Sequence, residues 1–171
     1  MSLRDASTCR AISSMVLRDA VAASTTAFAT SSISGCPDPV GAGSFVAALS
    51  NPASVLFLDI ETTGLSRYYD DITVVGWLTG GSYKVYVAGD DPSSLLADIA
   101  HAAALVTFNG TLFDLLFLKK TFGEFASPSV HADLRFLGRR AGLTEKKKAI
   151  ERELGISFRD GLEDVDGFQA V

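Results

Sequence analysis

The sequence has little cysteine, because Cys9 and Cys36 are its only two, and both lie toward its N-terminal end. Two cysteines so placed form neither a disulfide scaffold nor a metal-ligand cluster, so we expect a reduced, cytoplasmic setting. The sequence also lacks the run of roughly 18 apolar residues that a membrane helix needs, and we expect no membrane partner. Positive charge is scarce too. The net charge of −5 argues against coating nucleic acid through bulk charge, although a local basic surface stays possible.

Apolar residues are plentiful, at 47% of a 171-residue chain, which is enough for one domain with a core. The first 50 residues differ from the rest, since they are rich in Ser, Ala and Thr and poor in aromatics. Residues 31–43 have the composition of a linker, 10–22 are weakly amphipathic, and 44–50 suit a short helix. We therefore predict a poorly ordered or partly helical extension over 1–50 and a folded domain over 51–171.

Apolar periodicity divides the domain into alternating elements. Strands are predicted at 55–60, 71–79 and 82–88, and Gly80-Gly81 forms the turn between the last two. The next elements are a helix opened by Pro92, a strand at 105–108, a helix at 111–122, a strand at 129–133, and helices at 134–141 and 145–154. This order predicts an α/β fold with a mixed five-stranded sheet, three strands antiparallel and two parallel, flanked by helices.

Two carboxylates follow the apolar run of the first strand, in the stretch FLDIETTGL over 57–65. Side chains two positions apart on a strand share a face, so Asp59 and Glu61 point the same way. They lie at the C-terminal end of the strand, where open α/β sheets bind ligands. The following Thr-Thr-Gly turn offers hydroxyls beside them. Taken alone, the acids could also be simply exposed at the end of a strand.

A third carboxylate, Asp114, lies in an apolar helical segment. The large apolar residues cover most of the helix circumference, so we expect a buried helix; they are Leu112, Phe113, Leu115, Leu116, Phe117 and Leu118. Thr111 permits a capping box with Asp114, which would give this acid a purely structural role. Without a partner, a buried carboxylate costs several kcal/mol.

Together, the three acids predict a metal site. All of them start from the C-terminal edge of one sheet, where like charges would repel one another unless cations lay between them. Oxygen ligands without His or Cys favour Mg²⁺ or Mn²⁺ over zinc. Two such ions about 3.5–4 Å apart can clamp a phosphodiester, one activating water and the other stabilising the leaving oxygen.

Two stretches resemble motifs of the DEDD 3′–5′ exonucleases. FLDIETTGL is similar to the first motif, Asp-x-Glu-Thr-Thr-Gly-Leu, and FNGTLFDLLFL over 108–118 is similar to the second, in its Asn-Gly-x-x-Phe-Asp form. That form points to predicted exonucleases with a ribonuclease H-like domain, related to the proofreading domain of family B polymerases. HADLRFLGRR (131–140) and KKAIERELGI (147–156) also resemble segments of that group, so the resemblance covers 55–171.

The resemblance implies a ribonuclease H-like fold and a metal-dependent 3′–5′ exonuclease that cleaves phosphodiester bonds by a two-metal mechanism. Its metal ligands, for two Mg²⁺ or Mn²⁺ ions, would be Asp59, Glu61 and Asp114. Residues that would contact a single strand or a 3′ end, of DNA or RNA, are Thr62, Thr63, Gly64, Leu65, Asn109 and Phe113. Asp133 is either a family position near the site or a cap at the end of its strand.

The third motif of the family, a Tyr or His followed four positions later by Asp, has no counterpart in the sequence. Asp160, Asp164 and Asp166 could each replace the fourth carboxylate, and spacing does not choose among them. We therefore expect a C-terminally truncated domain, whose site is completed by another subunit or whose catalysis is impaired, because cleavage depends on both missing groups.

An alternative function is a non-catalytic nucleic-acid-binding module with a degenerate exonuclease site. Seven basic residues between Arg135 and Arg152, against two acids, could contact phosphates there or simply form a solvated helix face. A third reading is an α/β interaction domain with the acids as surface features. The sequence does not distinguish DNA from RNA as the substrate, and it leaves the oligomeric state open.

Overall fold

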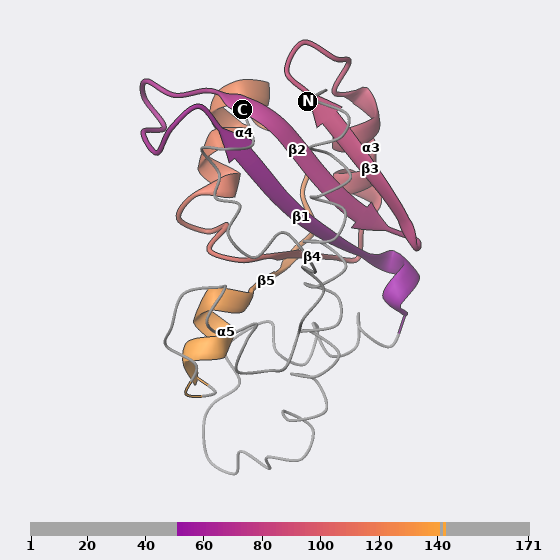
Figure 1. Ribbon diagram of the computed structural model, residues 1–171. Coiled ribbons are helices and arrows are strands. Elements are labelled where there is room, and N and C mark those ends of the chain that lie inside the picture. The colour runs from indigo at the N-terminus through magenta and orange to yellow at the C-terminus, as the bar shows by residue number, and fades with distance from the viewer. Residues whose placement is uncertain (1–50, 141, 143–171) are drawn as a thin grey trace, which may run out of the picture.

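Five strands form one sheet in the structure, a computed structural model that describes residues 51–140 and 142 (Figure 1). The strands are β1 (Val55–Thr62), β2 (Ile72–Thr79), β3 (Ser82–Val87), β4 (Ala104–Thr107) and β5 (Val130–Asp133). Their order across the sheet is β3-β2-β1-β4-β5. The pairs β1–β2 and β2–β3 are antiparallel, whereas β1–β4 and β4–β5 are parallel. The predicted mixed sheet is confirmed.

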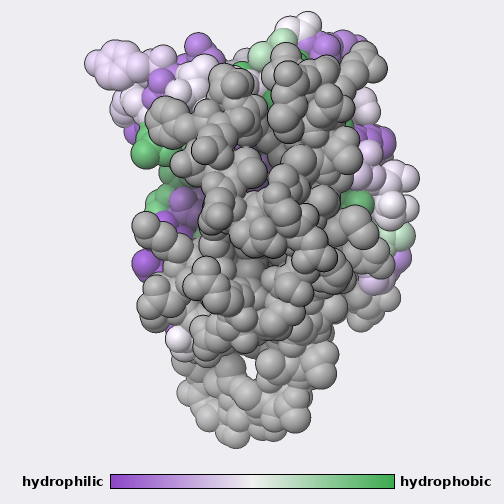
Figure 2. All heavy atoms as spheres, viewed as in Figure 1, coloured by the Kyte–Doolittle hydropathy of each residue, from purple (hydrophilic) through white to green (hydrophobic). Residues whose placement is uncertain are grey.

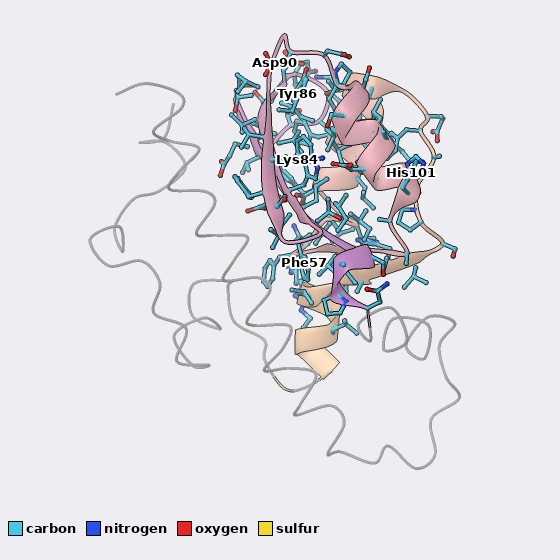
Figure 3. The ribbon with its side chains drawn as sticks, turned by 90° about the vertical axis from the view of Figure 1, so that its right-hand side faces the viewer. Phe57, Lys84, Tyr86, Asp90 and His101 are labelled. Atoms are coloured by element: carbon cyan, nitrogen blue, oxygen red, sulfur yellow. The ribbon has the colours of Figure 1, made fainter. Side chains whose placement is uncertain are left out.

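Helices cover both faces of this sheet. A single 3-10 turn, η1 (Pro52–Ser54), precedes β1, and the helices are α3 (Ser93–His101), α4 (Asp114–Phe122) and α5 (Leu134–Arg140). Side chains of α3 and α4 share one buried cluster with alternate residues of β1, and α5 packs on a cluster formed by the others. Figure 3 shows Lys84 and Tyr86 of β3 on the side of the sheet that faces α3. The layers are therefore α3 and α4, the sheet, and α5.

Strand β1 is the centre of the core because its residues are buried on both faces. Its side chains Leu56, Leu58 and Ile60 pack with α3 and α4. Val55 and Phe57 point to the opposite face, where they pack with β4, β5 and α5. A continuous apolar run is the pattern expected for a strand covered on both sides. The polar residues at the end of β1 therefore mark the point where this burial stops.

The helix predicted over 111–122 begins later than expected. Phe113 is its N-cap, with no side-chain capping bond, and Asp114 is its first residue. The capping box of Thr111 with Asp114, which was the alternative reading of this acid, is therefore absent. The late start of the helix has a tertiary cause. The amide of Thr111 donates to Asp133 Oδ2 at 3.0 Å, and this bond holds Thr111 in the preceding loop.

The prediction of a helix buried around its circumference is only partly right. Phe117 and Leu118 are fully buried in the core of α3, α4 and the sheet. Leu112 lies before the helix and is 56% exposed, while Lys119 and Lys120 face solvent. Helix α4 therefore buries one side, and its C-terminal half has a polar surface.

Several predictions lie outside the described residues. They concern the extension over 1–50 with its helix at 44–50, the helix at 145–154, most of the basic segment that ends at Arg152, and the acids considered as a fourth ligand. Of the helices in 51–140 and 142, none combines the length and apolarity needed to cross a membrane.

Candidate active site

Asp59 and Glu61 lie at the C-terminal end of β1. Alternation along the strand places them on the face of Phe57, opposite Leu58 and Ile60, which pack with α3 and α4. Both acids are partly exposed. Two carboxylates can be tolerated here because the strand has left the part of the sheet that is buried on both faces.

Asp114 reaches the same edge of the sheet from the neighbouring strand. Strand β4 runs parallel to β1, with Phe57 paired to Val106, so the two strands end at one edge. The chain then passes through a short loop to Asp114, the first residue of α4, which is 3% exposed. A carboxylate at a helix N-terminus is favoured by the helix dipole, which offsets part of the cost of burying it.

These acids do not form a complete metal cluster. In the part of the chain that the structure describes, no group of three or more His, Cys, Asp or Glu side chains is arranged to hold a metal ion. The donor chemistry nevertheless fits hard cations such as Mg²⁺ and Mn²⁺, which prefer carboxylate oxygens. The fold thus brings the three acids to adjoining strand ends, without gathering their side chains into one ligand set.

The loop after β1 folds around Asp70. Its carboxylate accepts a hydrogen bond from the Ser66 amide at 2.8 Å and another from Thr63 Oγ1 at 3.4 Å. A Cβ at position 64 would lie 2.5 Å from Asp70 Oδ2, closer than real Cβ contacts. Only glycine therefore lets this carboxylate approach the backbone. The glycine of the first motif has a structural role in this chain, which is to let the loop close.

The two threonines of the motif form hydrogen bonds within the same region. Thr62 Oγ1 donates to the Gly64 carbonyl at 2.5 Å. Thr63 Oγ1 accepts from the Asp71 amide at 3.0 Å, and the Thr63 amide donates to the Asp71 carbonyl at 2.9 Å. Both predicted substrate contacts thus shape the loop. Leu65, another predicted contact, is 87% exposed and lies open to a ligand.

Asp133 organises the loop between β4 and α4. It is 7% exposed at the end of β5, and its carboxylate accepts hydrogen bonds from the amides of Asn109 (2.8 Å), Thr111 (3.0 Å) and Arg135 (3.1 Å). Asn109 has a φ of 68°, and its side-chain oxygen accepts a hydrogen bond from Arg135 Nη1. Of the two readings of Asp133, these contacts favour the strand-end cap. They also give Asn109, a predicted substrate contact, a structural role.

Phe113, the last predicted substrate contact, lies just before Asp114. It packs against the core cluster that contains Phe117. The two ring centroids are 4.8 Å apart, with the planes inclined by 47°. The ring is partly buried, and it fixes the N-terminus of α4 against the core.

His131 on β5 is a residue near this loop that the sequence did not assign to the site. Its Nε2 lies 2.9 Å from Thr107 Oγ1. Burial lowers the pKa of His131 below 6.5, although the charge of Asp133 acts in the opposite direction. A Cβ at Gly110 would overlap Thr107 Oγ1, so Thr107 occupies the space beneath the loop. No local pattern could reveal this contact, because it joins residues 24 positions apart on neighbouring strands.

Comparison with known proteins gives one family match. The family model described as the RNase H superfamily matches residues 56–171. This range contains all three acids and every residue predicted to contact substrate. No curated protein matches the chain.

Several solved structures are similar to the chain. A nuclease in its apo form is 21% identical, with a TM-score of 0.54, over 73% of this chain and 66% of that one. Escherichia coli RNase D, an exoribonuclease involved in structured RNA processing, is 19% identical, with a TM-score of 0.51, over 71% of this chain and 33% of that one. Brucella melitensis NrnC with bound Mg²⁺ is 24% identical, with a TM-score of 0.50, over 69% of this chain and 65% of that one. The chain spans less than two thirds of each, and at these identities the likeness is one of fold.

Proposed function

The chain belongs to the RNase H superfamily, and on that premise we propose that it is a metal-dependent 3′–5′ exonuclease acting on single-stranded nucleic acid. One observation carries the proposal. Asp59 and Glu61 at the end of β1, and Asp114 after β4, lie at one edge of the sheet, because β1 and β4 are adjacent and parallel. The superfamily supports nuclease chemistry in general. The direction of cleavage, the DEDD type and a cytoplasmic location are parts of the proposal.

The proposed ligands of two Mg²⁺ or Mn²⁺ ions are the three acids. Bound ions of this kind supply positive charge that lowers the pKa of water and stabilises the leaving oxygen of a phosphodiester. Asp59 and Glu61 would hold them from β1, and Asp114 from the first turn of α4. NrnC, which shares the fold, is known with bound Mg²⁺, and this is consistent with the choice of ion.

The other predicted residues would position the strand. Leu65, exposed just beyond the acids, would contact the terminal nucleotide through its side chain. The Thr62–Gly64 turn keeps Leu65 in place through the bonds to Asp70 and Asp71 described above. Asn109 and Phe113 would shape the other side of the site, since they precede Asp114 in a loop that Asp133 holds. In this scheme the chain binds and orients the 3′ end beside the carboxylates.

The test is cleavage of single-stranded DNA and RNA that carry a label at the 5′ end. With Mn²⁺ or Mg²⁺ we expect a ladder of products shortened from the 3′ end, and EDTA should abolish it. Asp59→Asn and Asp114→Asn should each lower the rate by at least about 100-fold, because each removes a ligand charge. Glu124→Gln is the matched control, since Glu124 is an exposed acid whose ion pair, among the residues that the structure describes, is with Lys119.

The proposal fails if the folded chain cleaves neither strand with either ion, or if Asp59→Asn cleaves as fast as the control. Release of labelled mononucleotides from the 5′ end would refute the direction. Strand binding that persists in EDTA, without cleavage under any of these conditions, would support the alternative of a non-catalytic nucleic-acid-binding module.

A further inference from the structure

Exposed apolar side chains gather at the sheet edge that carries the acids. Among residues 51–140 and 142, the large apolar side chains that face solvent all lie shortly after the C-terminal ends of the parallel strands. They are Leu65, Tyr68 and Tyr69 after β1, Leu112 after β4, and Phe136 after β5. An apolar surface concentrated in this way usually indicates an interaction site.

Tyr68 and Tyr69 are the outermost members of this set. They are 72% and 88% exposed, so neither ring is needed by the core. Figure 1 shows the loop between β1 and β2 projecting beyond the sheet, and Figure 2 shows a protrusion coloured from white to purple at the same corner. Two neighbouring aromatic rings in such a position offer flat faces to a ligand from solvent.

A positive charge accompanies the rings. The guanidinium carbon of Arg67 lies 4.8 Å from the centre of the Tyr68 ring, and its Nη2 donates to Tyr68 Oη at 2.6 Å. A guanidinium has five N–H donors in a planar fork, which suits phosphate oxygens. The loop therefore combines aromatic faces with a donor for an anion.

The loop is held in place before any ligand arrives. The amides of Tyr69 and Asp70 both donate to the Ser66 carbonyl, at 3.1 and 2.8 Å. Lys120 of α4 donates to the Asp70 carbonyl at 2.7 Å and to Asp71 Oδ1 at 2.8 Å. A ligand that binds here therefore loses little free energy in ordering the loop.

We propose that Tyr68 and Tyr69 form a stacking surface for the unpaired bases of a single-stranded nucleic acid, with Arg67 contacting its phosphates. The inference rests on the proposed function, because a strand held here would run toward the acids at the end of β1. Every base has a π face, so stacking tolerates any sequence, whereas a duplex keeps these faces covered. Asp70 and Asp71 lie in the same loop, and Lys120 is paired with Asp71, so stacking rather than bulk charge supplies the attraction.

The test is binding of a labelled oligothymidylate and an oligouridylate to the full chain in EDTA, followed by fluorescence anisotropy. A matched abasic strand has the same length and charge but no rings to stack. The wild-type chain should bind the base-containing strands more tightly than the abasic strand. Tyr68→Ala and Tyr69→Ala should each weaken that binding by about 5- to 150-fold, the range expected for one stacked base, and should leave abasic binding unchanged.

Tyr68→Phe and Tyr69→Phe are the matched controls, because they keep the rings. Tyr69→Phe should bind like the wild type, and Tyr68→Phe, which also removes the acceptor of Arg67 Nη2, should bind more tightly than Tyr68→Ala. The fluorescence of Trp77, the only tryptophan, checks that each variant is folded. The inference is overturned if the alanine variants bind as tightly as the phenylalanine variants, or if the wild type prefers the abasic strand or a duplex. It also falls if the alanine variants change only the oligomeric state, which would assign the rings to a contact between copies of the chain.

This result can be separated from that of the cleavage test. If the chain binds through the tyrosines but never cleaves, the stacking surface stands and the exonuclease proposal fails. If cleavage depends on Asp59 while the alanine variants bind normally, the proposed function stands and the stacking surface is wrong.

Discussion

The carboxylate of Asp133 accepts a hydrogen bond from the backbone amide of Asn109 at 2.8 Å and thereby ties the end of β5 to the loop after β4. That loop leads to Asp114, so the position of a proposed metal ligand depends on a strand that follows it in the chain. The contact is well buried, since Asp133 is one of few buried charged residues in the described part of the chain. Asp133 therefore acts on the site through the backbone that it holds.

Replacing Asp133 by alanine should destabilise the fold strongly. The substitution leaves the amides of Asn109, Thr111 and Arg135 without their acceptor, and hydrogen bonds to a charged group contribute about 1.5–3 kcal/mol each. We expect the free energy of unfolding to fall by about 3 kcal/mol or more in urea titrations followed by Trp77 fluorescence. Asp133→Asn, which keeps one acceptor oxygen, should lose about half as much.

Asp90→Ala is a suitable control for this prediction. Asp90 is exposed and accepts one amide bond, from Val87 at 3.1 Å, so its loss should cost less than about 1 kcal/mol. Equal losses for Asp133→Ala and Asp90→Ala would contradict the role assigned to Asp133.

Most of the sheet was predictable from the sequence, because its strands follow local rules. The Gly80-Gly81 turn is an example. Both glycines have positive φ values, 56° and 77°, which is the backbone geometry that tight hairpins need and that glycine supplies. The apolar run of β1 likewise predicted a buried strand, and two parallel strands were predicted because helices separate them along the chain.

The details of the site were not predictable, because tertiary contacts decide them. A local rule favoured Thr111 as a helix cap, yet its amide pairs with Asp133, and the helix starts three residues later. Spacing also said nothing about Asp70, whose side chain fills the space beside Gly64. The three acids were predicted to meet because all of them start from the C-terminal edge of one sheet, and a common edge places residues near one another without orienting their side chains.

Gly64→Ala should disrupt the loop after β1. Its Cβ would lie 2.5 Å from the Asp70 carboxylate, and overpacking of this kind typically costs about 1–3 kcal/mol. The same substitution in an Asp70→Ala background should cost much less, because the conflicting atoms are gone. Urea unfolding of the two single variants and the double variant measures this coupling. Additive losses would show that the contact does not require glycine.

Asp98 should stabilise the fold at neutral pH but not in acid. Its Oδ2 accepts from Trp77 Nε1 and from Lys84 Nζ, both at 2.7 Å. Burial raises the pKa of Asp98, but the bonds from Lys84 and Trp77 lower it by more, so its pKa lies below 3.8. A carboxyl whose pKa is lowered by folding stabilises the folded state at pH values above its unfolded pKa. That stabilisation is lost as the pH falls through the pKa of the folded state.

Asp98→Asn should therefore cost about 1 kcal/mol at pH 7, as expected for a partly exposed ion pair and its hydrogen bonds. The difference between wild type and variant should shrink as the pH falls below about 4, because the unfolded carboxyl then binds a proton that the folded one does not, and it should vanish once the pH is below the folded pKa as well. Unfolding by urea at several pH values gives the comparison. A difference that stays constant from neutral pH into acid would show that the charge of Asp98 contributes nothing.

His131 should make the fold sensitive to pH in a higher range. Because burial lowers its pKa below 6.5, the unfolded chain binds a proton that the folded chain does not, at pH values between the folded and unfolded pKa. The stability that depends on neutral His131 is fully present above pH 6.5 and is lost as the pH falls. For one proton, the free energy of unfolding then changes by at most about 1.4 kcal/mol per pH unit. His131→Gln should reduce this slope in urea unfolding between about pH 7.5 and 5, whereas His101→Gln, a change at an exposed residue, should retain it. If both variants kept the wild-type slope, protonation of His131 would not be what destabilises the fold.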